Sequence, residues 1–232
     1  MSVSRLLKTM MAGAALLAAP MAASAQEDDQ GGWHVATKVP PIGPGDRIHG
    51  PVRADISVIV WLDPECPYCK QFGTTAETAI DNARGKANLA VRLFPLPFHG
   101  PNAMFASLSA LCVGEQGGDP AYYRYLDGWL ARTATNGAGL PAEPGQGGDP
   151  AIALATAAGA RDTAALASCT AAPATAERLN EEMRGAQRAG LAGTPSIAVR
   201  NNLSGRTIMV DGAVGADDLE AAIAYMGKQS AL

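Results

Sequence analysis

The sequence is poor in histidine and cysteine, the side chains that most often bind transition metals. Its 232 residues include three histidines and four cysteines. His34, His49 and His99 are far apart, and none is close in sequence to a pair of cysteines. Zinc sites are usually built from two such close pairs. We therefore predict no metal site and no other cofactor.

The sequence also lacks runs of basic residues and, beyond its first 25 residues, long apolar runs. The formal net charge is −4. Nucleic-acid binding relies on basic patches, and a membrane-spanning helix needs about 20 apolar residues. We therefore expect neither a nucleic-acid partner nor an integral membrane protein. The hydrophobic fraction of 47% is typical of a globular chain with a full core.

The N-terminus has the three-part layout of a secretory signal. Arg5 and Lys8 precede an apolar stretch at 10–23, and Ala23-Ser24-Ala25 follows it. Small residues at the first and third of these positions are typical of a cleavage site. We expect residues 1–25 to be a signal peptide cleaved after Ala25, and the protein to reside in the periplasm. The alternative is an uncleaved anchor.

Strand and helix patterns follow a polar segment rich in Gly and Pro. Residues 26–54 are expected to be a flexible lead-in with a short strand near 33–37. Continuous apolar runs predict buried strands, and helical spacing predicts a helix between them. Two strands and the helix that joins them should form a right-handed βαβ unit. The strands are expected at 55–62 and 87–95, and the helix at 66–84.

A helical insertion is predicted at about 102–190. Asp119-Pro120 and Asp149-Pro150 each place an N-cap residue before a favoured first helical residue. Tyr122, Tyr123 and Tyr125 are expected on the surface of an insertion helix. Further expected elements are a helix at 102–113, a mobile loop at 134–148, helices at 162–169 and 173–189, a hairpin of strands 196–200 and 207–210, and a helix at 217–225. The order indicates an α/β fold.

Cys66-Pro67-Tyr68-Cys69 lies where the first strand leads into a helix. Residues three apart share a helical face, so the two thiols can form a disulfide. Unpaired N–H groups at a helix start favour a thiolate on Cys66, and the thiolate is the reactive form. Cys69, one turn further, should be less exposed and act as the resolving thiol. The alternatives are a static disulfide and half of a zinc site.

Gly193-Thr194-Pro195-Ser196 precedes a predicted strand. A proline cannot donate to the strand ladder, but it fits at the strand start if its peptide bond is cis. Such a bend could bring the Thr194 backbone beside the cysteines and present polar groups to a substrate. The alternative is an ordinary loop proline.

These two motifs resemble those of a known family. The segment 61–72, Trp-Leu-Asp-Pro-Glu-Cys-Pro-Tyr-Cys-Lys-Gln-Phe, is similar to the active-site region of the periplasmic Dsb proteins, and Gly-Thr-Pro at 193–195 is similar to their cis-proline loop. The resemblance implies a thioredoxin-like domain at 55–228 that carries the helical insertion. It implies catalysis by Cys66 and Cys69, with substrate bound by Pro67 and Tyr68 and by Thr194 and Pro195.

The resemblance also implies partners. They are exported proteins with thiols or disulfides, and a membrane redox partner that reoxidises or re-reduces the cysteines. An apolar residue at Val60 and an acid at Asp63 are similar to isomerase-type members. The short segment before the first strand leaves no room for a separate dimerisation domain, so we expect a monomer. The sequence leaves open whether the protein acts as an oxidase or as an isomerase or reductase.

Cys112 and Cys169 are expected to form a structural disulfide, since paired cysteines are the rule in exported proteins. Two buried free thiols and a second redox pair are the alternatives. His99 is interpreted as structural. Two other functions remain open for the whole chain: a redox-inactive chaperone or binding protein with this fold, and a copper-delivery protein that uses Cys66 and Cys69 as soft ligands.

Overall fold

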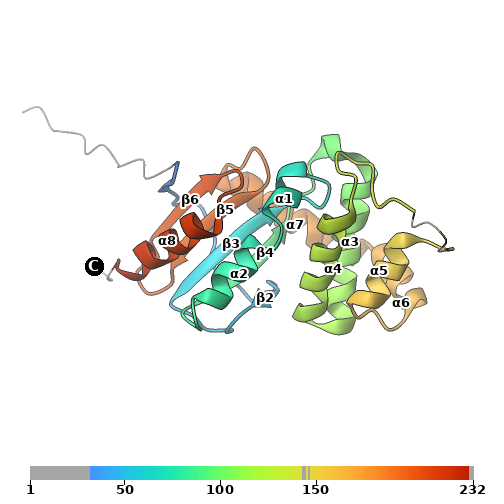
Figure 1. Cartoon of the computed structure of the whole chain (residues 1–232), viewed down its shortest axis with the longest axis horizontal. Helices are drawn as coiled ribbons and strands as arrows, with labels where there is room; N and C mark the ends of the chain where they lie inside the picture. Colours follow the sequence, from blue (N-terminus) through green and yellow to red (C-terminus); the bar gives the residue numbers. More distant parts are fainter. Residues whose placement is uncertain (1–31, 143–144, 146, 230–232) are drawn as a thin grey trace, which may run out of the picture.

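A six-stranded sheet forms the centre of the protein, in the order β1-β6-β5-β3-β4-β2 (Figure 1). The computed structural model describes residues 32–142, 145 and 147–229, so the predicted signal peptide lies outside the described residues. The strands are β1 His34–Val35, β2 Ile48–His49, β3 Ile56–Leu62, β4 Ala87–Leu93, β5 Ser196–Asn201 and β6 Thr207–Asp211. No helix in this described part is long and apolar enough to cross a membrane.

Strand β3 is the innermost element, and all seven of its residues are buried. It runs parallel to β4 and antiparallel to β5. Alternate side chains point to opposite faces of a strand, so Val58 and Val60 belong to one hydrophobic cluster and Ile59 and Trp61 to another. Burial on both faces explains why the strand is continuously apolar, as the sequence predicts.

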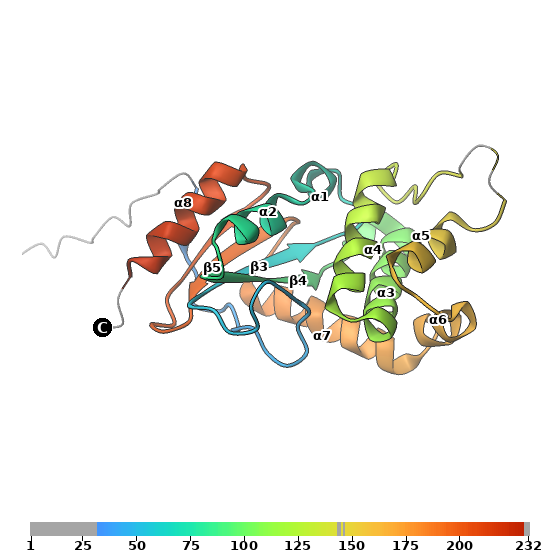
Figure 2. The same cartoon turned by 60° about the horizontal axis from the view of Figure 1, so that its bottom comes forward.

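Helices cover both faces of the sheet, as Figures 1 and 2 show. Helices α2 (Thr75–Asn82) and α8 (Ala216–Gly227) lie on one face. Helix α7 (Pro173–Ala189) lies across the other. This arrangement of helices around a sheet confirms the predicted α/β fold. The predicted hairpin of strands 196–200 and 207–210 is confirmed by the antiparallel pair β5 and β6.

The insertion lies between β4 and β5, and all of its helices except α7 pack at one end of the sheet (Figure 2). A disulfide joins Cys112 in α3 to Cys169 in α6, with a Cα–Cα distance of 5.8 Å. Asp149 caps α5 by accepting the Ala151 N–H, as predicted. Asp119 differs, because α4 begins at that residue and its carboxylate instead accepts the Ile48 N–H. The insertion consists of α3 Gly100–Gly117, α4 Asp119–Arg132, α5 Pro150–Ala158, α6 Thr163–Thr170 and α7.

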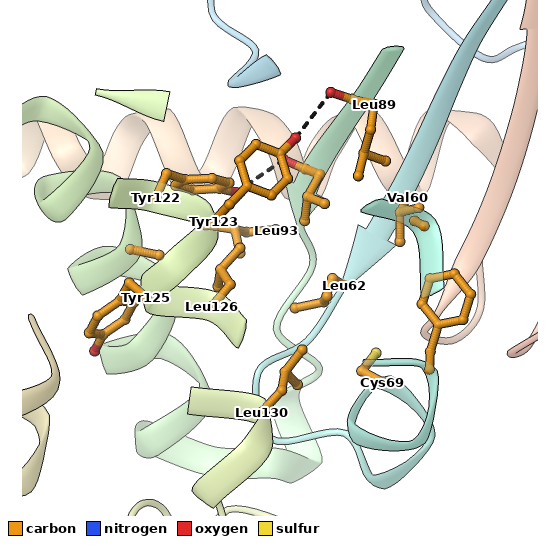
Figure 3. Close-up of a cluster of buried hydrophobic side chains, with 14 of the residues drawn as sticks. Val60, Leu62, Cys69, Leu89, Leu93, Tyr122, Tyr123, Tyr125, Leu126 and Leu130 are labelled. Atoms are coloured by element: carbon orange, nitrogen blue, oxygen red, sulfur yellow. Dashed lines mark hydrogen bonds between the residues drawn. The ribbon is translucent and has the colours of Figure 1, made fainter. Parts of the chain in front are cut away.

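The expectation that the α4 tyrosines lie on the surface is wrong. Tyr122, Tyr123 and Tyr125 are almost fully buried. Tyr122 and Tyr123 lie between α4 and the sheet, whereas Tyr125 points away from the sheet (Figure 3). The Tyr122 hydroxyl donates to the Val91 carbonyl at 3.0 Å, and that of Tyr123 donates to the Leu89 carbonyl at 3.0 Å. A buried tyrosine is tolerated when its hydroxyl finds a partner, and β4 supplies one because it borders the insertion.

The predicted continuous helix at 66–84 is also wrong. The structure divides it into α1 (Pro67–Phe72) and α2, separated by Gly73 and Thr74. Gly73 has φ 49° and ψ −130°, a backbone conformation that favours glycine. The break allows α1 to present the cysteines while α2 packs along the sheet.

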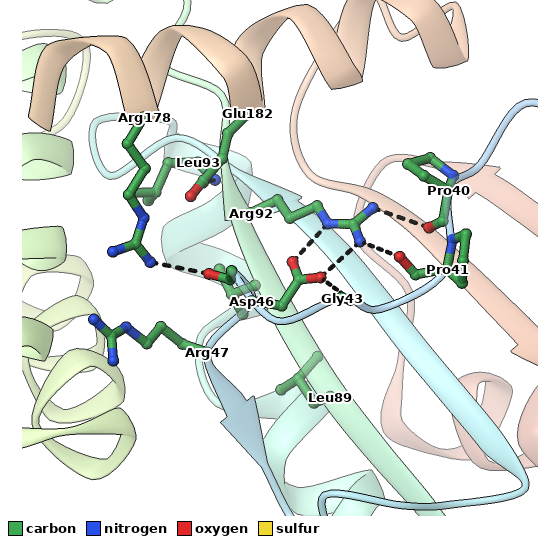
Figure 4. Close-up of polar contacts among 12 residues, drawn as sticks. Pro40, Pro41, Gly43, Asp46, Arg47, Leu89, Arg92, Leu93, Arg178 and Glu182 are labelled. Carbon is green, nitrogen blue, oxygen red and sulfur yellow. Dashed lines mark hydrogen bonds and ion pairs between the residues drawn. The ribbon is translucent and has the colours of Figure 1, made fainter. Parts of the chain in front are cut away.

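The segment expected to be a flexible lead-in is anchored to the sheet over its described residues. β1 pairs with β6, and β2 pairs with β4. Asp46 accepts from Arg92 Nε at 2.8 Å and from Nη2 at 2.9 Å, and the same guanidinium donates to the carbonyls of Pro40 and Pro41 (Figure 4). Both charged side chains are largely buried. The Gly- and Pro-rich segment 34–49, here called the strap, is therefore ordered by strand pairing at both ends and by the contacts of Arg92 between them.

Two acids, Glu77 of α2 and Asp127 of α4, predict a pH-dependent stability. Burial, with the nearby Asp127 and Asp81, raises the pKa of Glu77 to about 7, and burial raises that of Asp127 to about 6. A buried oxygen of Glu77 has no hydrogen-bond partner among the described residues. A carboxyl whose pKa is raised by folding destabilises the protein as pH rises from its unfolded value through its folded value.

We therefore expect Glu77→Gln to stabilise the protein by about 2 kcal/mol at pH 8 and to have little effect at pH 5. The measurement is chemical denaturation at both pH values. Glu220→Gln is the matched control, because this exposed carboxylate accepts from Asn82 and an amide oxygen can do the same. A stabilisation that is equal at pH 5 and pH 8 would contradict the charge argument.

Candidate active site

The two cysteines of the Cys-x-x-Cys motif lie at the end of β3, where α1 begins. Cys66 is the N-cap residue of α1, and Pro67 occupies the first turn, as the spacing predicts. Both cysteines are free in this structure. Cys66 is 3% exposed and Cys69 is 0% exposed. Both residues are therefore buried, and Cys66 is the less buried of the two.

The surroundings separate the acidities of the two thiols. The hydrogen bond with Cys69, followed by the side chain of Thr194 and the N–H groups of Cys69 and Tyr68, lowers the pKa of Cys66 to about 6 against the opposing effect of burial. Burial, together with the neighbouring Cys66, raises the pKa of Cys69 well above its ordinary value. At neutral pH this arrangement can supply one reactive thiolate and one protonated thiol.

The Thr194–Pro195 peptide bond is cis, and it lies against the cysteines. The Cys66 thiol donates to the Thr194 carbonyl at 3.1 Å, although the two residues are 128 positions apart in the sequence. Pro195 comes directly before β5, which pairs with β3. The pairing of these two strands explains how the two predicted motifs meet.

Tyr68 is the most exposed residue of the motif, at 63%, and Pro67 is half-buried. Both lie on the first turn of α1 beside Cys66. Phe98, which is 75% exposed, follows β4 in a short helical turn, Pro97–His99. The motif itself therefore combines a buried sulfur with one exposed aromatic side chain, that of Tyr68.

Residues 43–224 match the thioredoxin family. The chain belongs to this family. A search of curated proteins found no match. Among solved structures, DsbA2 of Pseudomonas aeruginosa is 26% identical, with a TM-score of 0.67 over 82% of this chain and 98% of that one.

Two further structures share the fold at lower identity. BdbD of Bacillus subtilis is 18% identical, with a TM-score of 0.67 over 84% of this chain and 100% of that one. A thioredoxin-like oxidoreductase from Silicibacter pomeroyi DSS-3 is 23% identical, with a TM-score of 0.61 over 81% and 95% of the two chains. These findings confirm the predicted resemblance to Dsb-type proteins and the thioredoxin-like fold.

In this thioredoxin-family protein, a buried acid three residues before Cys66 joins the motif to the start of the insertion. The Asp63 carboxylate accepts from the Leu96 N–H at 2.7 Å and from the Glu65 N–H at 2.8 Å. His99 Nδ1 lies 2.7 Å from the same carboxylate. Burial raises the pKa of Asp63 despite these partners. His99, interpreted from the sequence as structural, thus contacts the turn that carries Cys66.

Glu65 is the residue of the site to which the sequence assigned no role. It comes directly before Cys66, is 0% exposed, and accepts hydrogen bonds from Trp129, Thr133 and Gly139. Acidic residues are almost never fully buried unless they have partners. The position of Glu65, between an apolar strand and a helix, is therefore the sequence signal that could have predicted a contact between this acid and a distant element.

No group of three or more His, Cys, Asp or Glu side chains in the described ranges is arranged to hold a metal ion.

Proposed function

We propose that the protein is an exported thiol–disulfide oxidoreductase that exchanges disulfides with exported polypeptides through Cys66 and Cys69. The observation that carries the proposal is the pair of thiols at the start of α1. Cys66 is the N-cap residue, with a pKa lowered to about 6 and its sulfur against the Thr194 carbonyl, and the fully buried Cys69 lies one turn along the same helix. Membership of the thioredoxin family supports the same chemistry.

In the reducing direction, the Cys66 thiolate attacks one sulfur of a substrate disulfide. A mixed disulfide forms, and the other substrate sulfur leaves as a thiolate that takes up a proton. Cys69 then loses its proton and attacks Cys66, which releases the second substrate thiol and leaves a Cys66–Cys69 disulfide. Two electrons have passed to the substrate. Oxidation of a substrate dithiol is the reverse sequence, and a membrane redox partner would restore the starting state.

The Thr194-Pro195 bend and the exposed Tyr68 would hold the substrate beside Cys66. An extended peptide can hydrogen-bond to free backbone groups at a strand start. Pro67 and Tyr68 would contact the residues that flank the substrate cysteine. Cys112 and Cys169, joined between α3 and α6, would take no part in exchange.

The pKa of Cys66 predicts the reduction potential. A thiolate stabilises the reduced form, so each unit by which its pKa falls below the ambient pH raises the potential by about 30 mV. Thioredoxin, with a nucleophile pKa of about 7, has a potential of about −270 mV, and DsbA, at about 3.5, has about −120 mV. With a pKa of about 6 for Cys66, the slope of about 30 mV and interpolation between these two proteins together give an expected potential of roughly −230 to −240 mV for the Cys66–Cys69 couple.

The test is equilibration of the protein with glutathione buffers, read by mass spectrometry of alkylated thiols. The same preparations should reduce a disulfide-bonded polypeptide faster than they oxidise a reduced one. A potential near −120 mV would reverse this direction, and failure to exchange with either polypeptide would reject the proposed function.

A further inference from the structure

The insertion segment 133–139 lies against the turn that carries Cys66. The sequence predicts residues 134–148 to be a mobile loop, but the first part of that range is held in place. The Asn136 N–H donates to the Glu65 carbonyl at 2.8 Å. Lys70 of α1 donates from Nζ to the Thr133 carbonyl at 2.6 Å. The Gly137 carbonyl accepts from Asn102 of α3 at 2.8 Å.

The buried carboxylate of Glu65 is the anchor of this segment. Its Oε1 accepts from Trp129 Nε1 and from Thr133 Oγ1, each at 2.7 Å. Its Oε2 accepts from the Gly139 N–H at 3.0 Å. Three donors, two of them at the two ends of the segment, therefore stabilise a charge that would be costly to bury alone. Since its carbonyl also binds Asn136, Glu65 contacts the segment at three points.

One residue of the segment is held in a conformation that it does not favour. Thr135 has φ 65° and Asn136 has φ 51°, both in the left-handed region, which asparagine tolerates but which is unfavourable for a β-branched residue such as threonine. The side chains of Ala134, Asn136 and Ala138 are nevertheless exposed. A strained, exposed segment beside a nucleophile is where a binding surface is expected.

We propose that segment 133–139 is the second edge of the substrate site, opposite Thr194-Pro195, and that Glu65 is the positioning residue that holds it there. The inference rests on the proposed function. The ligand is the main chain of a polypeptide on either side of its disulfide. A small disulfide such as cystine has no polypeptide main chain on either side, so the segment should select polypeptides without altering the sulfur chemistry.

Two variants loosen the segment in different ways. Glu65→Gln replaces Oε2 by an NH2 group that cannot accept from Gly139 but leaves an oxygen for Trp129 and Thr133. Asn136→Pro removes the N–H that donates to Glu65, and its ring cannot adopt a positive φ. Because Asn136 is exposed, the second variant keeps the test available if the first fails to fold.

Glu182→Gln is the matched control. Glu182 of α7 is another buried carboxylate that accepts a backbone N–H, that of Leu93, at 2.6 Å. It makes no contact with the segment among the hydrogen bonds of the described residues. The same chemical change is therefore made away from the proposed site.

The reduced protein is reacted in a single turnover with two disulfides, a ten-residue peptide that contains a disulfide and cystine. The measurement is the second-order rate constant of each reaction. We expect the ratio of the two constants, peptide over cystine, to fall about tenfold in Glu65→Gln and Asn136→Pro, equivalent to about 1.4 kcal/mol. The ratio should stay within about twofold of wild type in Glu182→Gln.

An unchanged ratio in both variants would overturn the inference. This includes the case in which the rate constants for the peptide and for cystine fall by the same factor, since Glu65 would then act on Cys66 itself. A wild-type protein that reacts with neither disulfide would reject the proposed function instead, so the two failures are distinguishable.

Discussion

Replacing Cys66 by serine should abolish disulfide exchange completely, because no other thiol among the described residues is placed to attack a substrate. Cys69 is fully buried and its pKa is raised well above the ordinary value. Cys112 and Cys169 are joined to each other. The measurement is reduction of a disulfide-bonded polypeptide under conditions in which wild-type protein turns over. Residual turnover above the uncatalysed rate would show that another residue supplies the nucleophile.

Replacing Cys69, the proposed resolving thiol, should have a different effect on the exchange reaction. Cys69→Ser should accumulate a mixed disulfide between Cys66 and the substrate, visible as a mass increase that a reductant removes, since the second exchange step is blocked. Cys112→Ala/Cys169→Ala is the control for thiol content, and it should retain exchange. Absence of a trapped complex would contradict the role of Cys69.

The rate of Cys66 alkylation should follow its thiolate fraction. In wild type the rate should rise with pH through about 6 and level off above that, because the pKa of Cys66 is lowered to about 6. The hydrogen bond with Cys69 is the largest cause of this lowering. Cys69→Ala should therefore move the midpoint to higher pH, and Cys69→Ser, whose hydroxyl can still donate, should move it less.

Asp46→Ala should cause the largest loss of stability. Among the described residues, this carboxylate is the one acidic group that accepts hydrogen bonds from the largely buried Arg92 guanidinium. Removing one partner of a buried ion pair leaves an uncompensated charge and costs about 3 kcal/mol or more. For a protein of this size the melting temperature should fall by roughly 10 °C, as calorimetry would show.

Two control variants test whether the loss of stability in Asp46→Ala comes from the buried Asp46–Arg92 ion pair. Glu181→Ala removes a carboxylate that pairs with Arg184 and Arg188 on the exposed face of α7, and it should leave the melting temperature unchanged, since exposed pairs contribute little. Asp46→Leu/Arg92→Met should lose less stability than Asp46→Ala, because no unpaired charge remains. A wild-type melting temperature for Asp46→Ala would show that the strap at 34–49 is not anchored by this contact.

Sequence patterns within short stretches of the chain were sufficient to predict the central strands and the start of one insertion helix. Apolar runs predicted β3 and β4, turn residues predicted the β5–β6 hairpin, and an Asp before Pro predicted the start of α5. Each of these depends on residues within a few positions of one another. The break at Gly73 was missed because one glycine is tolerated within a helical pattern.

Burial of the α4 tyrosines could not be predicted for a different reason. Helical spacing shows which residues share a face, but not which element covers that face. Tyr122 and Tyr123 are buried because β4, about 30 residues earlier in the chain, supplies both the packing surface and the carbonyl acceptors. Likewise, the Gly- and Pro-rich strap is ordered by Arg92, 46 residues beyond Asp46.

The candidate active site is divided in the same way. The sequence by itself determined the Cys66–Cys69 pair and its place at a helix start, because the chemistry and the spacing are both local. Only the tertiary structure decided that Thr194 lies beside Cys66, and that Glu65 binds donors 64, 68 and 74 residues away. A buried carboxylate is stabilised by whichever donors the fold brings to it, and that information is not contained in the residues around Glu65.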